Sequence, residues 1–232
     1  MKNEIAKTQK QELSVEYTNA PRQGFEVACQ REDLIVPRAK LFQGLPTEYE
    51  EYPDAKPGQI LNNVTKEVLP SIFIPIMRHI EWIRFNPRDA KDPNFDSAYA
   101  PAEVIWRSSN PNDPRVVEEA KWGANGEKPK ALKFLSFLSY LPGSSMPVVI
   151  SFHKTSMNAG KAVNSVLEYS KGAMYEHQFK LASKMTKSDQ YSYYVLQTTY
   201  AGKASTEDVA RCAELYSTFV KSNMEVKPEY TD

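Results

Sequence analysis

Cysteine, glycine and long apolar runs are all scarce in this chain of 232 residues. Its two cysteines, Cys29 and Cys212, lie far apart and share no metal-ligand spacing with the three histidines. Their scarcity argues against a disulfide scaffold and a zinc knuckle, and it predicts a reducing compartment. No apolar run approaches the roughly 18 residues of a membrane span, and the polar stretch after Met1 lacks the apolar region of a secretory signal. We therefore expect no membrane partner.

Signatures of catalysis are missing as well. The sequence contains no phosphate-binding glycine loop, no HExxH zinc motif and no GxSxG nucleophile turn. His79, His153 and His177 fall within or at the ends of expected strands, where histidines are more often packed or solvated than catalytic. The sequence thus predicts a protein that is not an enzyme and that carries no cofactor.

One acidic segment leaves a metal site open. Four residues have the oxygen-ligand spacing of a calcium loop: Asp92, Asn94, Asp96 and Glu103. Ser97 replaces the glycine that makes the sharp turn in such loops. A metal-dependent nuclease would use similar acids, including Glu81 and Asp89, but no acid–x–Lys pair falls on the adjacent expected strands. A nuclease therefore remains a minor alternative.

Lysine is abundant in the middle of the chain, although the net charge is zero. Residues 121–203 carry eleven lysines against four acidic residues, and both flanking regions carry an acidic excess. A positive block of this kind can attract a polyanion even in a neutral protein. A solvated lysine surface is the alternative interpretation.

The apolar pattern predicts an α+β fold, mainly β. Sixteen prolines and thirteen tyrosines against nine glycines favour strands with stiff loops. Extended segments are expected at 33–45, 71–85, 131–141, 147–153, 175–186 and 191–201, and helices at 155–169 and after Ser205. The long segment 71–85 is expected to bend at Pro75. Residues 47–54 are interpreted as an acidic turn, and Asp113 as the cap of a short helix starting at Pro114.

This order matches a five-stranded oligonucleotide-binding barrel, in which a helix lies between the third and fourth strands. The predicted domain spans residues 25–222 and includes loop insertions and a C-terminal helix. Residues 1–24 are expected to form a flexible arm, and residues 223–232 a short tail.

Aromatic and basic residues alternate along the expected strands. Single-stranded nucleic acid is held by cations along its phosphates and by rings on which bases stack. Lys180 and Lys184 share the polar parity of their strand, and Tyr193 and Tyr194 have opposite parities, so one of the two should face outward. The predicted contacts are Arg78, Arg84, Trp106, Arg107, Lys133, Tyr140, Lys180, Lys184 and Tyr193.

Four segments resemble bacteriophage and prophage proteins thought to bind single-stranded DNA. These are PRAKLFQGLP (37–46), SSNPNDPRVVEEAKWGANGEKPKA (108–131), MPVVISFHKTSMNAGK (146–161) and YYVLQTTYAGKAS (193–205). The resemblance covers roughly residues 33–220 and implies a barrel of the oligonucleotide-binding type. It also implies a role in phage DNA replication or recombination, in the cytoplasm of the host cell.

We therefore expect a sequence-tolerant single-stranded-DNA-binding protein, whose partners include phage replication or recombination proteins. Many such proteins end in a strongly acidic tail, whereas this chain ends in EVKPEYTD (225–232). The alternative is a phage structural or protein-interaction module without nucleic-acid binding. The oligomeric state, the site size and the preference for DNA over RNA stay open.

Overall fold

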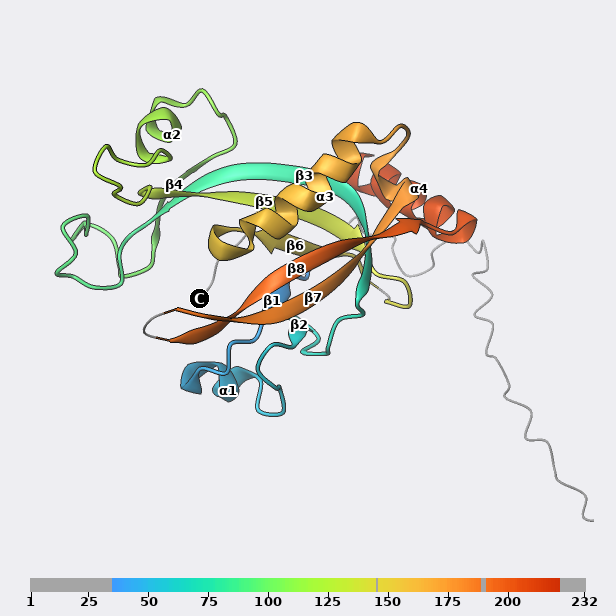
Figure 1. Cartoon of the computed structure of the whole chain (residues 1–232), viewed down its shortest axis with the longest axis horizontal. Helices are drawn as coiled ribbons and strands as arrows, with labels where there is room; N and C mark the ends of the chain where they lie inside the picture. The colour runs from blue at the N-terminus through green and yellow to red at the C-terminus, as the bar shows by residue number, and fades with distance from the viewer. Residues whose placement is uncertain (1–34, 145, 189–190, 222–232) are drawn as a thin grey trace, which may run out of the picture. The chain divides into compact units, whose positions relative to one another are not determined.

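The computed structural model describes residues 35–144, 146–188 and 191–221, which form an α+β fold made mainly of strands (Figure 1). Its strands are β1 Ala39–Leu41, β2 Ile60–Asn62, β3 Ile72–Phe85, β4 Val104–Ser108, β5 Ala131–Tyr140, β6 Val148–Phe152, β7 His177–Lys187 and β8 Ser192–Lys203. Its α-helices are α1 Pro46–Glu51, α2 Pro114–Glu119, α3 Met157–Tyr169 and α4 Thr206–Lys221. The predicted arm at 1–24 and tail at 223–232 lie outside the described residues.

Among the described residues, six strands form one antiparallel sheet around the long strand β3. The order is β6-β5-β3-β7-β8, and β4 pairs with the end of β3 beside this path. β3 pairs with β5 from Ile74 to Arg84, but with β7 only at Ile72 and Phe73. Figure 1 shows the result: β3 and β5 run side by side, and β7 and β8 form a separate antiparallel pair.

Most of the elements expected from the sequence are confirmed. The long strand, the hairpin β5–β6, the helix α3 and the strands β7 and β8 follow one another in the expected order. The bend at Pro75 is present as a register shift between Pro75 and Met77. Asp113 caps α2 as expected, because its carboxylate accepts a hydrogen bond from the backbone N–H of Arg115.

The acidic turn expected at 47–54 was wrong in part, because residues 46–51 form α1. Pro46 stands at the first helical position, where a missing N–H costs nothing. The Glu48 carboxylate then accepts hydrogen bonds from the backbone N–H groups of Gln43 (2.9 Å) and Leu45 (3.2 Å). A carboxylate in the first turn stabilises a helix start, and proline with glutamate therefore begins a helix here.

Within the described residues the sheet is not a closed barrel, because β6 and β8 end the strand order without pairing to each other. Other segments occupy their edges. The backbone N–H of Val149 in β6 donates to the carbonyl of Pro37 (2.8 Å). In β8, the Gln43 side chain accepts from the Tyr194 N–H (2.8 Å) and donates to the Tyr194 carbonyl (3.1 Å). The segment 37–43 thus satisfies backbone groups on both edge strands.

Helix α3 and its N-cap residue Ser156 contact β8 beyond Tyr194. The backbone N–H of Leu196 donates to the Ser156 hydroxyl (3.0 Å), and the Thr198 hydroxyl donates to the carbonyl of Ala159 (2.8 Å). On the side toward β6, the helix packs at the buried Gly160, where an added Cβ would lie 2.6 Å from the Cβ of Phe152. Close approach at this glycine sets the distance between α3 and the sheet.

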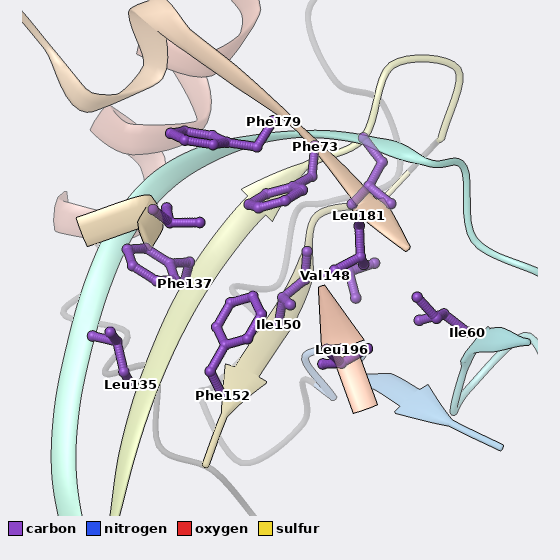
Figure 2. Close-up of a cluster of buried hydrophobic side chains, with 12 residues drawn as sticks. Ile60, Phe73, Leu135, Phe137, Val148, Ile150, Phe152, Phe179, Leu181 and Leu196 are labelled. Atoms are coloured by element: carbon purple, nitrogen blue, oxygen red, sulfur yellow. The ribbon is translucent and has the colours of Figure 1, made fainter. Parts of the chain in front are cut away.

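The main core lies between the sheet and α3. It contains twelve buried residues: Ile60, Phe73, Leu135, Phe137, Leu141, Val148, Ile150, Phe152, Val163, Phe179, Leu181 and Leu196. Figure 2 shows Phe73 and Phe179 lying over one another, with ring centroids 5.6 Å apart. This stacked pair joins β3 to β7 at the short ladder between them, so apolar packing supports the few hydrogen bonds there.

Helix α4 packs against the opposite face of β3, near the start of the strand. Its Cys212 is fully buried beside Ile74 and Ile76, and burial raises the pKa of the Cys212 thiol to about 12. The thiol is therefore protonated at neutral pH, and its place is in the core. None of the described helices is both long enough and apolar enough to cross a membrane.

Gly160→Ala tests the packing of α3. Alanine should favour the isolated helix by about 1 kcal/mol, but its methyl group overlaps Phe152. We expect the free energy of unfolding, measured by urea titration, to fall by about 1–2 kcal/mol. Ser165→Ala on the exposed face of α3 is the control and should not destabilise the protein. A Gly160→Ala variant as stable as the wild type would show that α3 moves freely against β6.

Candidate nucleic-acid interface

Strands β7 and β8 carry three of the predicted contacts on one face. Lys184 pairs with Val195, and Thr186 pairs with Tyr193, so Lys180, Lys184 and Tyr193 share the same side of the strand pair. Both lysines are exposed, and neither has an ion-pair partner among the described side chains. Tyr193 is half-buried, with its ring centroid 5.8 Å from that of the exposed Tyr191. We call these four residues the β7–β8 surface.

Tyr194 faces the opposite side, as its parity requires. Gly58 lies directly under its ring, where an added Cβ would come within 2.6 Å of the ring carbons. Gly58 also has a φ of +87°, which glycine adopts without strain. The Ser183 hydroxyl donates to the carbonyl of Gly58. These contacts fix one face of β7–β8 against residues 43–58, so its other face, which carries Lys180 and Lys184, is held in place.

Three more predicted contacts, Arg84, Trp106 and Lys133, share a different face of the sheet. Arg84 pairs with Trp106 across β3 and β4, and Lys133 pairs with Trp82 across β3 and β5. The Lys133 ammonium lies 5.2 Å from the centre of the Trp82 ring. A cation over the ring face is a favourable contact in its own right. Lys133 is exposed, so it remains accessible to an anion from the solvent.

Arg84 and Trp106 are engaged inside the protein. The Arg84 guanidinium forms an ion pair with Glu119 (3.7 Å) and donates to the carbonyls of Asn94 (3.0 Å) and Lys130 (3.3 Å). The Trp106 indole donates to Glu119 (3.2 Å), and the guanidinium of Arg115 covers its ring at 5.1 Å. Arg84 therefore ties two loops to β3, and Trp106 anchors α2.

The last three predicted contacts lie apart from one another. Arg78 forms an ion pair with Glu168 and a hydrogen bond with Asn164, both on α3. Tyr140 packs in the apolar cluster beneath α4. Arg107 pairs with Ile83, which places it on the sheet face opposite Trp106. The structure thus brings together two groups of three predicted residues. Arg78 shares the sheet face of Arg84 and Lys133 but is engaged by α3, and Tyr140 and Arg107 lie elsewhere.

The acidic segment of residues 92–103 is folded by its own hydrogen bonds. The carboxylates of Asp92, Asp96 and Glu103 accept backbone N–H groups of Asn94 (2.8 Å), Ala98 (2.9 Å) and Ala100 (2.6 Å). Across the described part of the chain, no three His, Cys, Asp or Glu side chains come close enough to hold a metal ion. The local role of these carboxylates is to form turns.

Sequence reasoning missed a cleft of about 600 Å³ between three loops. Five cationic side chains line it: Arg84, Arg88, Lys128, Lys130 and Lys154. The lysine-rich composition of residues 121–203 was a signal for Lys128, Lys130 and Lys154, but the sequence pattern did not show that they meet. We call this feature the loop cleft. Trp122 was missed for a different reason, because an exposed ring outside a strand has no periodicity.

A buried histidine stands at the base of β7–β8. His177 is 3% exposed, its Nδ1 lies 3.1 Å from the Tyr200 hydroxyl, and its Nε2 lies 3.1 Å from the Lys203 ammonium. Burial, followed by the charge of Lys203, lowers the pKa of His177, and the nearby Glu176 opposes this shift. A neutral imidazole with a proton on Nδ1 accepts from Lys203 and donates to Tyr200, so the neutral form fits its surroundings.

This histidine predicts a pH dependence of stability. The unfolded chain takes up a proton near pH 6.5, whereas folded His177 resists protonation, so the unfolded state binds more protons below that pH. We expect the free energy of unfolding to decrease as pH falls from about 7.5 to about 5.5. The His177→Gln variant should show a weaker decrease over the same range. An identical pH dependence in the wild type and in His177→Gln would contradict the assignment of this effect to His177.

Comparison with known proteins gives one family. The model of a family described as Pam3 phage gp34-like protein matches residues 6–225 of this chain. No curated protein and no solved structure matches it.

Proposed function

We propose that this chain, which belongs to the Pam3 phage gp34-like family, is a non-enzymatic protein that binds single-stranded DNA without strong sequence preference. Phage DNA replication or recombination in the host cytoplasm is the setting in which it would act. Phage replication or recombination proteins would be its partners. The family is named after a phage protein, which supports the phage setting and leaves the activity to be argued from the surface.

The β7–β8 surface carries this proposal. Lys180 and Lys184 lie about 13 Å apart at the rise of a strand, which is close to two phosphate spacings in an extended single strand. Both are exposed and unengaged by acidic side chains of the described chain. Tyr193 stands on the same face beside the exposed Tyr191. Sequence-tolerant binding of single strands uses lysines that contact the phosphates of the nucleic acid and aromatic rings on which its bases stack.

The strand order is a second support. The long strand β3 pairs with the hairpin β5–β6 on one side and with β7 on the other, and α3 lies between β6 and β7 in the chain. Oligonucleotide-binding folds are partly open five-stranded barrels. We propose that β3, β5, β6, β7 and β8 are such a barrel, opened between β6 and β8 and bridged there by residues 37–43.

Binding to single strands in preference to duplex is the first expected result. Stacking needs unpaired base faces, which a duplex does not offer. Fluorescence anisotropy with labelled oligothymidine and with duplex of equal length, at two salt concentrations, measures the preference. Equal affinity for both, or no binding at low salt, would favour the alternative of a phage structural or interaction module. Metal-dependent loss of the labelled strand would instead favour a nuclease.

The lysines and the tyrosine of the β7–β8 surface should act differently. The double change Lys180→Ala with Lys184→Ala should weaken binding to all base sequences alike and reduce the salt slope by roughly 1.4, since each phosphate contact contributes about 0.7. Tyr193→Ala should cost about 1–3 kcal/mol with little change of slope, because it removes a stacking ring. Titrations at four salt concentrations separate the two effects.

Matched controls make this comparison specific. Lys56 and Lys171 are exposed lysines of other segments, and changing both to alanine removes the same charge. The Tyr193→Phe variant keeps the ring and should bind like the wild type. If the control pair lowers the salt slope as much as Lys180 and Lys184 do, the effect is one of net charge and the β7–β8 surface is not the contact.

A further inference from the structure

We propose that the loop cleft, together with the nearby Trp122, forms a second contact region for the same DNA strand, in which lysines of the cleft hold phosphates and Trp122 stacks on a base. This inference rests on the proposed function and deepens it, since it names where the strand continues beyond the β7–β8 surface. It concerns residues that belong to loops and that no strand pattern predicts.

The cleft is strongly cationic. Lys128, Lys130 and Lys154 line it from two different loops, and none of the three has an ion-pair partner among the residues that the structure describes. Asp89 and Asp92 also line it, but their carboxylates accept backbone N–H groups of Lys91 (2.9 Å) and Asn94 (2.8 Å). Five cationic side chains thus line the cleft with two carboxylates, and a cleft with an excess of positive charge concentrates anions.

The size of the cleft suits one nucleotide rather than an inorganic ion. Its volume of about 600 Å³ falls within the range of sites for small organic ligands. Arg84 fixes its walls, because the guanidinium donates to the carbonyls of Asn94 and Lys130, one in each of two flanking loops. The site is thus held in shape before a ligand arrives, which reduces the entropy that binding must offset.

Lys154 has a backbone conformation that points to function. It lies two residues after the end of β6 with a φ of +46°, in the left-handed region that few residues other than glycine adopt. Strained residues of this kind persist where the surrounding structure holds them and gather at binding sites. A lysine, rather than the glycine that would fit the backbone more easily, occupies the position and lines the cleft.

Trp122 provides the aromatic ring on which a base would stack. Its side chain is 65% exposed, an unusual state for the largest apolar residue. The backbone N–H of Gly123 donates to the carbonyl of Glu127 (2.9 Å), which closes a short loop. Trp122 and Lys128 flank this closed loop, so their backbones lie close together, although Trp122 does not itself line the cleft. An exposed ring beside phosphate-binding lysines is the arrangement on which unpaired bases stack.

Two variants test the inference against labelled oligothymidine. Changing Lys128, Lys130 and Lys154 together to alanine should reduce the salt slope by about 0.7 for each phosphate that these lysines hold. The control changes Lys56, Lys161 and Lys171, which line neither the cleft nor the β7–β8 surface, and should leave the slope nearly unchanged. Trp122→Ala should weaken binding about 5- to 150-fold, and Trp122→Phe should restore most of the affinity.

Tryptophan fluorescence gives an independent readout. Oligothymidine should quench the emission of the wild type, and in Trp122→Phe most of this quenching should disappear while the anisotropy of the labelled strand still reports binding. Urea midpoints equal to that of the wild type show that the variants are folded. If the wild type binds no strand, the proposed function fails and the cleft assignment with it. If the wild type binds and the cleft variants keep its slope and quenching, the cleft inference alone is overturned.

Discussion

Pro75 has no backbone N–H to donate, and the arrangement of the sheet depends on this. β3 pairs with β7 at Ile72 and Phe73, and that ladder ends two residues before the proline. The β3–β5 register shifts immediately after it. A proline cannot extend the hydrogen bonding of a central strand to both neighbours. Beyond Pro75, β3 therefore pairs with β5 and, from Trp82, with β4, but no longer with β7. The pair β7–β8 continues on its own, and Lys180 and Lys184 on one of its faces are exposed.

A strand pair that leaves its sheet needs other partners for its edge. For β8, these partners are the side chain of Gln43 and the N-cap residue Ser156 of α3. The Gln43 side chain forms hydrogen bonds with both the N–H and the carbonyl of Tyr194, and the Ser156 hydroxyl accepts a hydrogen bond from the N–H of Leu196. An unpaired edge is a template for aggregation, so these contacts protect β8 as well as position it. Residues 37–43 contact both β6 and β8, so the opening between these two strands is bridged without a seventh strand in the sheet.

Local sequence patterns predicted the strands and helices. The role of each side chain instead depends on contacts with residues that are distant in sequence. The period-2 alternation of β7 correctly placed Lys180 and Lys184 on an exposed face, since parity is a property of the strand alone. Arg78 and Arg84 have the same kind of signal, but each meets a carboxylate that is distant in sequence, Glu168 or Glu119. No pattern within β3 contains that information. The loop cleft was not predicted for the same reason, because its lysines come together from two loops that are distant in sequence.

Several arginines of this protein form ion pairs within the fold, whereas the lysines of the two proposed contact regions do not, and this difference bears on the proposed function. In the described chain, Arg78, Arg84 and Arg115 each form an ion pair with a carboxylate of the protein. The lysines of the β7–β8 surface and of the loop cleft form none there. A guanidinium offers a planar fork suited to fixed bidentate geometry, whereas an ammonium is a compact charge on a flexible stem. The fixed geometry of arginine ion pairs stabilises the fold. The flexible lysine side chains suit contacts with a DNA backbone whose phosphate positions vary with base sequence. Lys40, Lys66 and Lys203 pair with carboxylates as well. Under the proposed function, the polyanion is held by the lysines of the β7–β8 surface and of the loop cleft, although the net charge of the chain is zero.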